Sequence, residues 1–323
     1  MVIGRRLLFV LGMSALSVAL CPSFASSHDL KGMIRTEVMD QPLETIRKPN
    51  GDLIGRGVIA NLYKWPSHRK LTICFIGGTR SLRSKIAAAM QRQWHLHQLT
   101  RGYLDFNAAS FSDLADCGAA ASPNYDIRVG FLHGAYGGYW SYIGVDSRNH
   151  VPSMNFEGFD SNAPAEPDFD RLVAHEFGHA LSLEHEHQSP MVPPCDWNYD
   201  YIYTHYSWQS PADMHANLDK LKNYVYNGKY LYSFTTYNKK SIMHYYFEPL
   251  AFVKGRNSKC YILQNNNVPS EEDKTFITQQ YAPATFGGFR GLDTSLEDLS
   301  RIPNARLQQV IATKRQLLRD AER

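Results

Sequence analysis

Two histidines and a glutamate within five residues have the spacing of a metal site. The chain runs His175-Glu176-Phe177-Gly178-His179 at this point. Side chains four residues apart lie one above the other on a helix, so both imidazoles can point at one ion. Glu176 lies beside the first histidine, where its carboxylate can reach an ion-bound water without binding the ion. The spacing predicts a zinc site with a general base next to it.

A third ligand is needed, because catalytic zinc takes three protein ligands and keeps one position open. His185 follows His175 by ten residues, beyond a break in the helical pattern. His187 shares a strand face with His185 and is the rival third ligand. The metzincin spacing selects His185, which leaves His187 as a solvated side chain or one that supports a ligand.

Downstream motifs extend the pattern. The metzincin motif demands a methionine turn, and Ser241-Ile242-Met243-His244-Tyr245 supplies one. This turn, the extended histidine motif and the segment Gly138-Tyr139-Trp140-Ser141-Tyr142 together resemble the astacins, a family of zinc proteases. The sequence Pro269-Ser270-Glu271-Glu272-Asp273 resembles the start of the family's closing helix. The resemblance covers about Trp65 to Tyr281.

The resemblance implies a fold and a role for each matching residue. The fold is α+β, the metzincin or zincin type, with a twisted mixed sheet, a backing helix and an active-site helix in the upper subdomain, and an irregular lower subdomain. His175, His179 and His185 are implied as zinc ligands, with Glu176 as general base. Met243 is implied as the floor beneath the metal. Tyr245 matches a tyrosine that binds zinc at rest and swings to stabilise the oxyanion.

The resemblance also implies how substrate binds. Residues 139–143 match an edge strand that pairs with an extended peptide through main-chain hydrogen bonds, which demand little of the peptide's sequence. Two departures stand out. Ser182 replaces the glycine of the metzincin bend, where the backbone can need a positive φ. Glu186 matches the glutamate that ties down a newly cut N-terminus, but Gln188-Ser189-Pro190 replaces the arginine and acidic residues that usually follow.

Several predicted elements must position these residues. Alternating apolar residues predict strands at 70–75, 103–106, 126–132 and 139–145. A helix capped by Ser81 is predicted from an apolar stripe that ends at Trp94. His95 and His97 near its end are expected to be surface or packing histidines and not ligands. Asp168 or Asp170 is predicted to cap the helix that carries the metal motif. A shorter helix is expected to start at Ser210-Pro211.

The N-terminus has the features of an export signal. Arg5 and Arg6 precede an apolar run from Leu7 to Leu20 and a small-residue cleavage site that ends at Ala25. The alternative is a membrane anchor, but the run is shorter than the ~20 apolar residues that span a bilayer. Export through the twin-arginine route and lipidation of Cys21 are two further alternatives. The prediction is a signal peptide over 1–25 and a secreted protein, periplasmic if bacterial.

Four cysteines remain after that cleavage, an even number in an exported protein. Two disulfides are therefore expected, and the sequence by itself allows three pairings. With the two subdomains that the resemblance implies, we predict that Cys74 pairs with Cys117 in the upper half and that Cys195 pairs with Cys260 in the lower half.

The flanks of the 65–283 protease domain are less patterned. Residues 26–64 are polar and are predicted to form a pro-segment or arm without a core of its own. Asp52 in Asn50-Gly51-Asp52 is either a latch that caps the zinc, as in the family's pro-segments, or part of a plain turn. The tail at 284–323 holds a helical stripe after Asn304, which either packs on the domain or binds a membrane surface or partner.

Composition narrows the function classes. The formal net charge is only +3 over 323 residues, and the chain has no lysine or arginine block, which argues against nucleic acid as the main partner. The predicted function is a zinc-dependent endopeptidase that acts on protein or peptide substrates in extended form, without stable membrane insertion. The competing hypothesis is a non-catalytic zinc-containing binding protein. Glu176 and Tyr245 argue against it, because a structural zinc needs neither.

Overall fold

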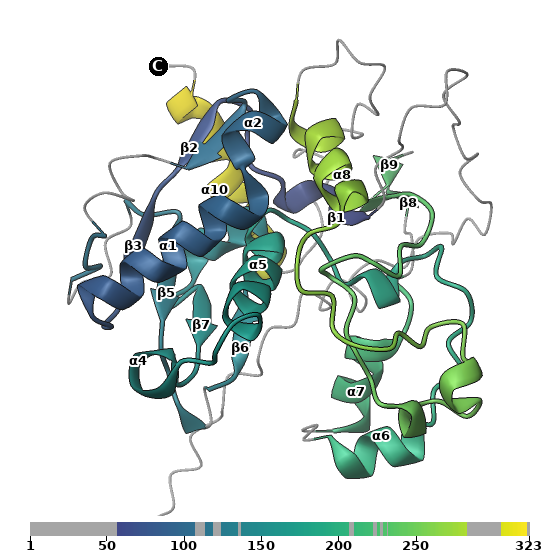
Figure 1. The fold of residues 1–323 in the computed structure, drawn as a ribbon. Coiled ribbons are helices and arrows are strands. Elements are labelled where there is room, and N and C mark those ends of the chain that lie inside the picture. Colours follow the sequence, from purple (N-terminus) through teal and green to yellow (C-terminus); the bar gives the residue numbers. More distant parts are fainter. Residues whose placement is uncertain are drawn as a thin grey trace, which may run out of the picture.

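The computed structural model describes most of the chain from Gly57 onward (Figure 1). The predicted signal peptide, Cys21, Asp52 and the Asn304 cap lie outside the described residues. In the described part, no helix is long and apolar enough to cross a membrane. The described ranges are 57–106, 114–118, 124–134, 137–206, 210–221, 225–226, 229–230, 232–282 and 305–321.

An open mixed sheet forms the centre of the upper half. Its strands lie in the order β3 (Ile73–Phe75), β5 (Ile127–Gly130), β7 (Met154–Phe156) and β6 (Tyr139–Ser141). The first three are parallel, and β6 runs antiparallel to β7. Every residue of β3, β5 and β7 is buried, as expected where both faces of a parallel sheet are covered. The mixed sheet of the predicted α+β fold is confirmed, with β6 at an edge.

The observed strands differ from the predicted ranges in detail. The first predicted strand is divided into β2 (Arg69–Leu71), which pairs with β4 (Leu104–Phe106), and β3. Thr72 separates β2 from β3, and its N–H donates to the Asp126 carboxylate at 3.0 Å instead of to a neighbouring strand. The fourth predicted strand stops at Ser141 and is followed by the 3-10 helix η4 (Gly144–Asn149).

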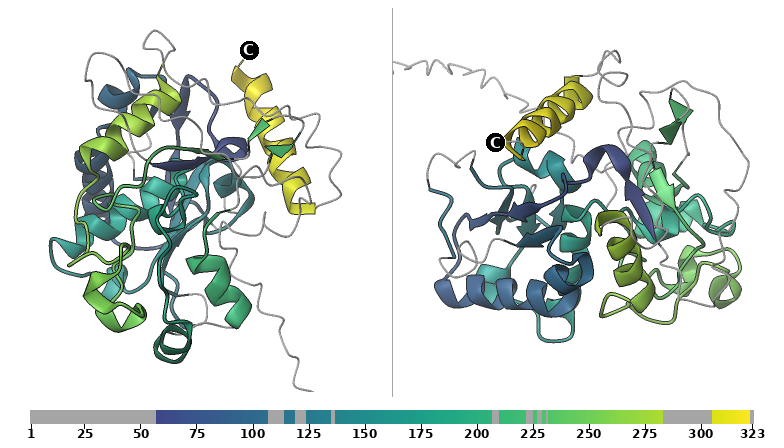
Figure 2. Two further views of the ribbon diagram at one scale, coloured as in Figure 1. Left: turned by 90° about the vertical axis from the view of Figure 1, so that its right-hand side faces the viewer. Right: turned by 90° about the horizontal axis from the view of Figure 1, so that it is seen from above.

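Helices cover both faces of the sheet. In the view from above, α1 (Arg80–Trp94) lies on one side and α10 (Ala305–Ala321) on the other (Figure 2). The second long helix, α5 (Asp168–Ala180), packs against α1. These two are the predicted backing and active-site helices. The cap of α1 is Thr79, not Ser81: the Thr79 hydroxyl accepts the Leu82 N–H at 3.2 Å, which leaves Ser81 within the first turn.

The C-terminal helix α10 packs on the domain, the first of the two alternatives for the tail. Its apolar face is buried against η4 and η2 (Asn61–Tyr63). Lys314 is buried with it, and its ammonium donates to the carbonyls of Asn61 and Leu62 at 3.3 and 3.1 Å. Leu318, near the end of the helix, is 39% exposed. The helix thus closes over the segment that enters the domain.

That entering segment belongs to the core. The strand β1 (Val58–Ala60) is fully buried and pairs antiparallel with β10 (Tyr232–Phe234). Leu62 and Tyr63 are buried as well. From Gly57 onward, the arm that was predicted to lack a core is therefore part of the domain. The sequence analysis missed this because a pairing between strands more than 170 residues apart leaves no signal in the local pattern.

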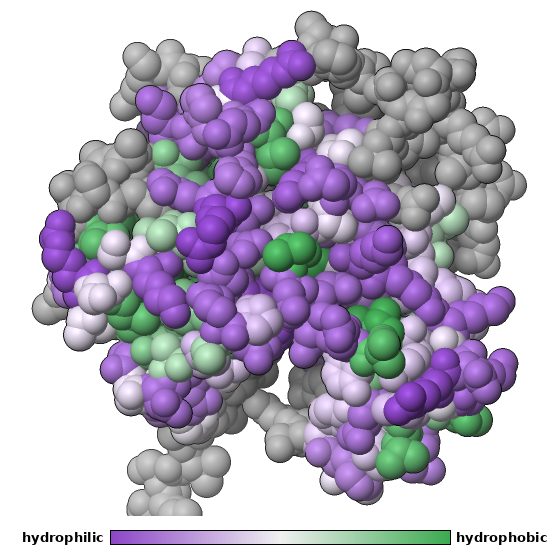
Figure 3. All heavy atoms as spheres, in the orientation of Figure 1, coloured by the Kyte–Doolittle hydropathy of each residue, from purple (hydrophilic) through white to green (hydrophobic). Residues whose placement is uncertain are grey.

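The lower half is irregular, as predicted, and has its own apolar cluster around Trp197, Met214 and Phe247. Figure 3 shows the face of Figure 1 covered mainly by hydrophilic side chains, with apolar ones in small separate groups. The predicted disulfides Cys74–Cys117 and Cys195–Cys260 are both present, one in each half. The remaining elements are α2 (Leu96–Thr100), α4 (Phe159–Asn162), η5 (Glu186–Gln188), α6 (Tyr199–His205), α7 (Pro211–Leu218), β8 (Val225–Tyr226), β9 (Lys229–Tyr230), η6 (Pro249–Ala251), η7 (Gly255–Asn257) and α8 (Glu271–Tyr281).

Candidate active site

Helix α5 presents the metal motif. It starts at Asp168 after Pro167 and has no side-chain cap, so the predicted capping by Asp168 or Asp170 is wrong. Both carboxylates lie in the first turn, where negative charge is favourable at the positive end of the helix dipole. From Leu172 to Ala180 every residue is buried, which fixes the direction of the helix and of the side chains that it carries.

A tight bend follows the helix and returns the chain toward the histidines. Ser182 has a φ of 72°, the left-handed conformation expected where metzincins have glycine. Its hydroxyl donates to the Tyr63 carbonyl at 2.9 Å, which offsets part of the conformational cost. Strand β1 pairs with the bend: Ala60 N–H donates to Ser182 O at 3.1 Å, and Glu184 N–H donates to Val58 O at 3.0 Å. The entering segment thus holds the loop that precedes His185.

The structure brings His175, His179 and His185 together. Their ligand nitrogens lie within 4.8 Å of one another, and all three side chains are buried. The Nδ1 atoms of His175 and His179 lie 2.9 Å from the carbonyls of Ile242 and Leu183. These contacts leave the Nε2 atoms to face a common point, and the Nε2 atoms of His179 and His185 are 3.1 Å apart.

Burial keeps two of these imidazoles neutral. It holds the pKa of His175 well below its usual range, with the positive charge of a protonated His179 acting in the same direction. Burial also lowers the pKa of His179 to about 4, against a hydrogen bond with the Leu183 carbonyl that raises it. A neutral imidazole is the form that binds a metal.

Gln188 contacts the third histidine and was not assigned a role from the sequence. Its Oε1 lies 3.3 Å from His185 Nδ1. Its amide nitrogen donates to the carbonyls of Ala216 and Asp219, each at 2.9 Å. The side chain therefore orients His185 from the lower half. The available signal was a polar side chain three residues after a predicted ligand, because metal-binding imidazoles usually donate their second N–H to an acceptor.

His187, the rival third ligand, is not part of the three-histidine cluster. Its side chain is fully buried, so the expectation of a solvated side chain is wrong. Its Nε2 lies 2.9 Å from the Asn217 carbonyl, and its ring stacks on Tyr245 with centroids 5.1 Å apart. His187 thus supports the wall of the site. His95 and His97 are exposed, as expected.

The methionine turn lies directly under α5. Gly178 packs so closely on Met243 that a Cβ at position 178 would overlap the Met243 sulfur. The turn is fastened from α8: Asp273 accepts hydrogen bonds from Ser241 Oγ at 2.6 Å and from Ile242 N–H at 2.9 Å. The carbonyl of the same Ile242 contacts His175, so the turn fixes one of the clustered imidazoles.

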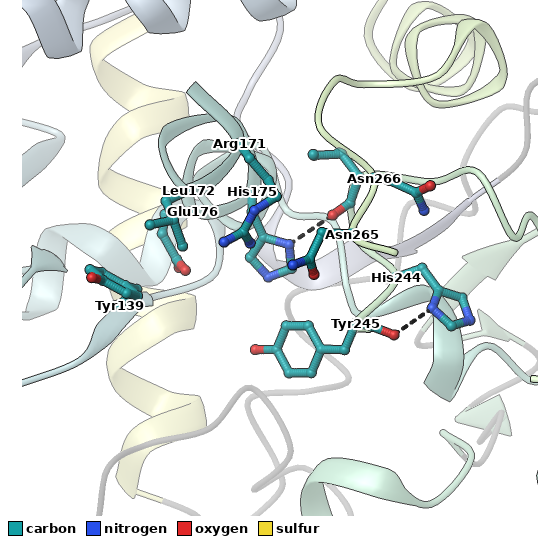
Figure 4. Close-up of a pocket in the computed structure, with 10 residues that line it drawn as sticks. Tyr139, Arg171, Leu172, His175, Glu176, His244, Tyr245, Asn265 and Asn266 are labelled. Carbon is teal, nitrogen blue, oxygen red and sulfur yellow. Dashed lines mark hydrogen bonds between the residues drawn. The ribbon is translucent and has the colours of Figure 1, made fainter. Parts of the chain in front are cut away.

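Glu176 and Tyr245 face one cavity of about 190 Å³, which His175 also lines (Figure 4). Glu176 is buried, and its Oε2 has no hydrogen-bond partner among the described residues. Burial raises the pKa of Glu176 to about 8, and the nearby Arg171 acts in the opposite direction. Burial also raises the pKa of Tyr245, so its phenol keeps its proton. The Tyr245 ring lies 5.2 Å from that of His175.

The edge strand β6 borders the same cavity. Tyr139 lines it and is 44% exposed. In the described sheet β6 stands last in the strand order, next to β7. Glu186, which matches the glutamate that ties down a newly cut N-terminus in the family, is buried, and its carboxylate accepts the Asn238 N–H at 2.7 Å.

The donor set fits a metal ion. His175 Nε2 and Glu176 Oε2 are both buried without a hydrogen-bond partner in the described structure, and both residues line the same cavity. Two buried polar atoms in such a position each cost free energy unless something else binds them. Three imidazoles beside an open cavity are the ligand set of a catalytic zinc site.

The comparisons with known proteins agree with this geometry. No protein-family model matches the chain, and no curated protein sequence matches it. Among solved structures, one of myroilysin aligns at a TM-score of 0.54 and 29% identity, over 70% of this chain and 99% of that chain. A crystal structure of myroilysin aligns at a TM-score of 0.45 and 28% identity, over 75% of this chain and 99% of that chain. High choriolytic enzyme 1, a hatching enzyme zinc-protease from Oryzias latipes (Medaka fish), aligns at a TM-score of 0.36 and 16% identity, over 72% of this chain and 96% of that chain.

The mixed sheet, the two long helices and the histidine bend over a methionine turn define a metzincin. Within the metzincin class, the chain is an astacin-like zinc metalloprotease.

Proposed function

We propose that the chain is a secreted endopeptidase in which His175, His179 and His185 bind a zinc ion and Glu176 is the general base. The observation that carries the proposal is the pair of buried atoms His175 Nε2 and Glu176 Oε2, neither of which has a hydrogen-bond partner in the described structure. Both lie at one cavity. A ligand and a base that face the same open space are what hydrolysis by an activated water requires.

Zinc bound at such a site lowers the pKa of water to about 7 and polarises a carbonyl oxygen. Glu176 accepts a proton from the attacking water at its Oε2. The same carboxyl can then pass this proton on to the departing amine, since one carboxylate can act first as base and then as acid.

Tyr245 supplies a second proton donor. Its phenol is protonated, since burial raises its pKa, and its ring stands beside those of His175 and His185 at 5.2 and 4.2 Å. We propose that the hydroxyl donates a hydrogen bond to the oxyanion that forms from the substrate carbonyl. His187 and Phe247 pack against the Tyr245 ring and limit its positions.

The substrate is a peptide in extended form along β6. An extended peptide can add to the edge of a sheet by main-chain hydrogen bonds, and β6 is the last strand of the described sheet. Tyr139 at the start of β6 lines the cavity, so a peptide on this edge would pass over Glu176.

Export and maturation are part of the proposal. The signal pattern at 1–25 and two disulfides support a secreted protein. We propose a pro-segment that begins after Ala25, with Asp52 as a latch on the metal or part of a turn. Because residues from Gly57 are built into the core, processing that keeps the enzyme intact must cut before Gly57.

The test uses protein trimmed before Gly57 and a denatured protein substrate. We expect cleavage that a chelator abolishes and that added zinc restores. A trimmed and zinc-loaded protein that cleaves neither a denatured protein nor a peptide library would contradict the proposal and favour a zinc-containing binding protein.

A further inference from the structure

Glu157 directly follows β7 and binds the chain just ahead of β6. Its N–H donates to the Gly138 carbonyl at 3.2 Å. Its carboxylate accepts the Gly134 N–H at 3.1 Å through Oε1 and the Gly138 N–H at 2.6 Å through Oε2. One side chain thus receives two main-chain groups in front of the strand that borders the active-site cavity.

The chain ahead of β6 is shaped to receive this carboxylate. Gly134 and Gly138 have φ values of 69° and 82°, in the left-handed region that glycine adopts without strain. A Cβ at Gly137 would overlap the carboxylate, so the Glu157 side chain lies directly on the Gly137 backbone. The hydrogen bonds from Gly138 and Gly134 lower the pKa of Glu157 from its ordinary value, so the carboxylate is charged at neutral pH. N–H groups bind such a charged acceptor more strongly than a neutral one.

Asn155 on β7 holds the same stretch of chain independently. Its Oδ1 accepts the Leu132 N–H at 2.6 Å, and its Nδ2 donates to the carbonyls of Leu132 and Gly138 at 3.1 and 2.8 Å. Asn155 is fully buried, whereas the Glu157 side chain is 38% exposed. A substitution of Glu157 should therefore loosen the start of β6 without opening the core.

The position of Gly138 determines which main-chain groups of β6 face outward. The Gly138 carbonyl and the Tyr142 N–H both bond to residues that flank β7. Facing residues in an antiparallel pair alternate between hydrogen-bonded and non-hydrogen-bonded pairs, so the main-chain groups of Tyr139 and Ser141 point away from β7. Tyr139 also lines the cavity. The first main-chain groups that a peptide meets on this edge therefore lie next to the anchored Gly138.

We propose that Glu157 is a positioning residue for substrate binding. Its carboxylate fixes the start of β6, and through it the main-chain groups of Tyr139 and Ser141 that pair with an extended peptide. The inference rests on the proposed endopeptidase function. Glu157 takes no part in the proton transfers proposed for Glu176 and Tyr245, so its loss should weaken peptide binding far more than it slows the chemical step.

The test uses internally quenched peptides that share one scissile bond and differ in length. Each is extended residue by residue on either side of the bond, so that only the longer peptides lie along β6. For Glu157→Gln we expect KM of the longest peptide to rise about tenfold, the size of a lost hydrogen bond to a charged group, with kcat changed by less than about twofold. KM of the shortest peptide should stay at the wild-type value.

A second variant reaches the same contact from the other side. Gly137 does not have a left-handed φ, so Gly137→Ala acts through its methyl group, which displaces the carboxylate. It should reproduce the length-dependent rise in KM. In a Glu157→Ala background the same substitution should add nothing, because the two residues act through one contact.

Asp160→Asn is the matched control for charge. His133 lies between the two carboxylates, 3.8 Å from Glu157 and 3.4 Å from Asp160, and the Asp160 side chain is 36% exposed. The substitution thus removes one negative charge beside the same histidine without touching the glycines, and it should leave KM unchanged at every peptide length.

The results separate this inference from the function on which it rests. Wild-type KM values in folded Glu157→Gln and Gly137→Ala would overturn the role of Glu157 alone. So would a rise in KM that is equal for short and long peptides, an equal rise in Asp160→Asn, or a fall in kcat without a change in KM. Failure of the wild type to cleave any of the peptides would overturn the proposed function and this inference with it.

Discussion

The carboxylate of Asp273 accepts a hydrogen bond of 2.6 Å from the hydroxyl of Ser241. The same carboxylate accepts the N–H groups of Ile242 and Ser270, so it caps α8 and holds the methionine turn at once. The Ile242 carbonyl in turn contacts His175, so Asp273 connects α8 to the metal motif through the methionine turn.

Removal of that carboxylate should destabilise the fold. Asp273→Ala leaves buried donors on Ser241 and Ile242 without an acceptor, and we expect the free energy of unfolding to fall by about 3 kcal/mol. Glu271→Ala is the control in the same turn, because Glu271 is exposed and should change the value by less than about 0.5 kcal/mol. Urea unfolding of both variants gives the comparison. Equal losses would show that Asp273 does not hold the turn.

The same residue gives a pH dependence of stability. Burial raises the pKa of Asp273 to about 6, against hydrogen bonds from Ser241 and Ile242 that lower it. The folded protein therefore holds this proton more tightly than the unfolded chain, whose value is near 3.8. The stabilisation that comes from this proton on Asp273 is complete below about pH 3.8 and is lost as the pH rises through about 6. The free energy of unfolding falls by on the order of 3 kcal/mol over this range.

This pH dependence can be isolated by difference. The free energy of unfolding of wild type minus that of Asp273→Asn should decrease between pH 4 and 7, since asparagine does not titrate. Urea midpoints at several pH values measure it. A flat or rising difference would contradict the raised pKa.

Gly178 tests the packing between α5 and the methionine turn. In an exposed helix, Gly→Ala stabilises by about 1 kcal/mol. Here we expect Gly178→Ala to destabilise by about 1–3 kcal/mol, because the new Cβ overlaps the Met243 sulfur. Adding Met243→Ala should remove most of that penalty in a double-mutant cycle. Additive effects of the two substitutions would argue against the contact.

The proposed oxyanion role of Tyr245 makes a kinetic prediction. Tyr245→Phe removes one hydroxyl and should lower kcat by ~10²-fold to 10³-fold while the bound zinc and the fold are retained. Tyr246→Phe is the matched control, since the neighbouring Tyr246 is 37% exposed and does not line the cavity. Steady-state kinetics on one peptide substrate would separate the two, and an unchanged kcat in Tyr245→Phe would remove this tyrosine from the mechanism.

The parts of the site that local spacing encodes were predictable. Helical periodicity placed His175 and His179 on one face, and the length of the bend identified His185 over His187. The positive φ at Ser182 followed from its position in the motif. These are short-range features, in which residue type and separation along the chain determine the geometry.

The supporting residues were not predictable, because they act across long separations. Asp273 holds a turn that lies about 30 residues earlier, and β1 pairs with β10 across most of the domain. Strand β7, which pairs with β5 and with β6, was not predicted. The cap of α1 was misassigned between Thr79 and Ser81 because both are hydroxyl residues near the helix start, and only the backbone path distinguishes them.

The central claim is that Glu176 is the general base and is not a metal ligand. Its most direct test is zinc content and turnover, measured together on the trimmed wild type, Glu176→Gln and His179→Ala. We predict one zinc per chain in wild type and in Glu176→Gln, with kcat in the latter lower by at least ~10²-fold, and loss of zinc from His179→Ala. Turnover in zinc-loaded Glu176→Gln close to that of wild type would contradict the account.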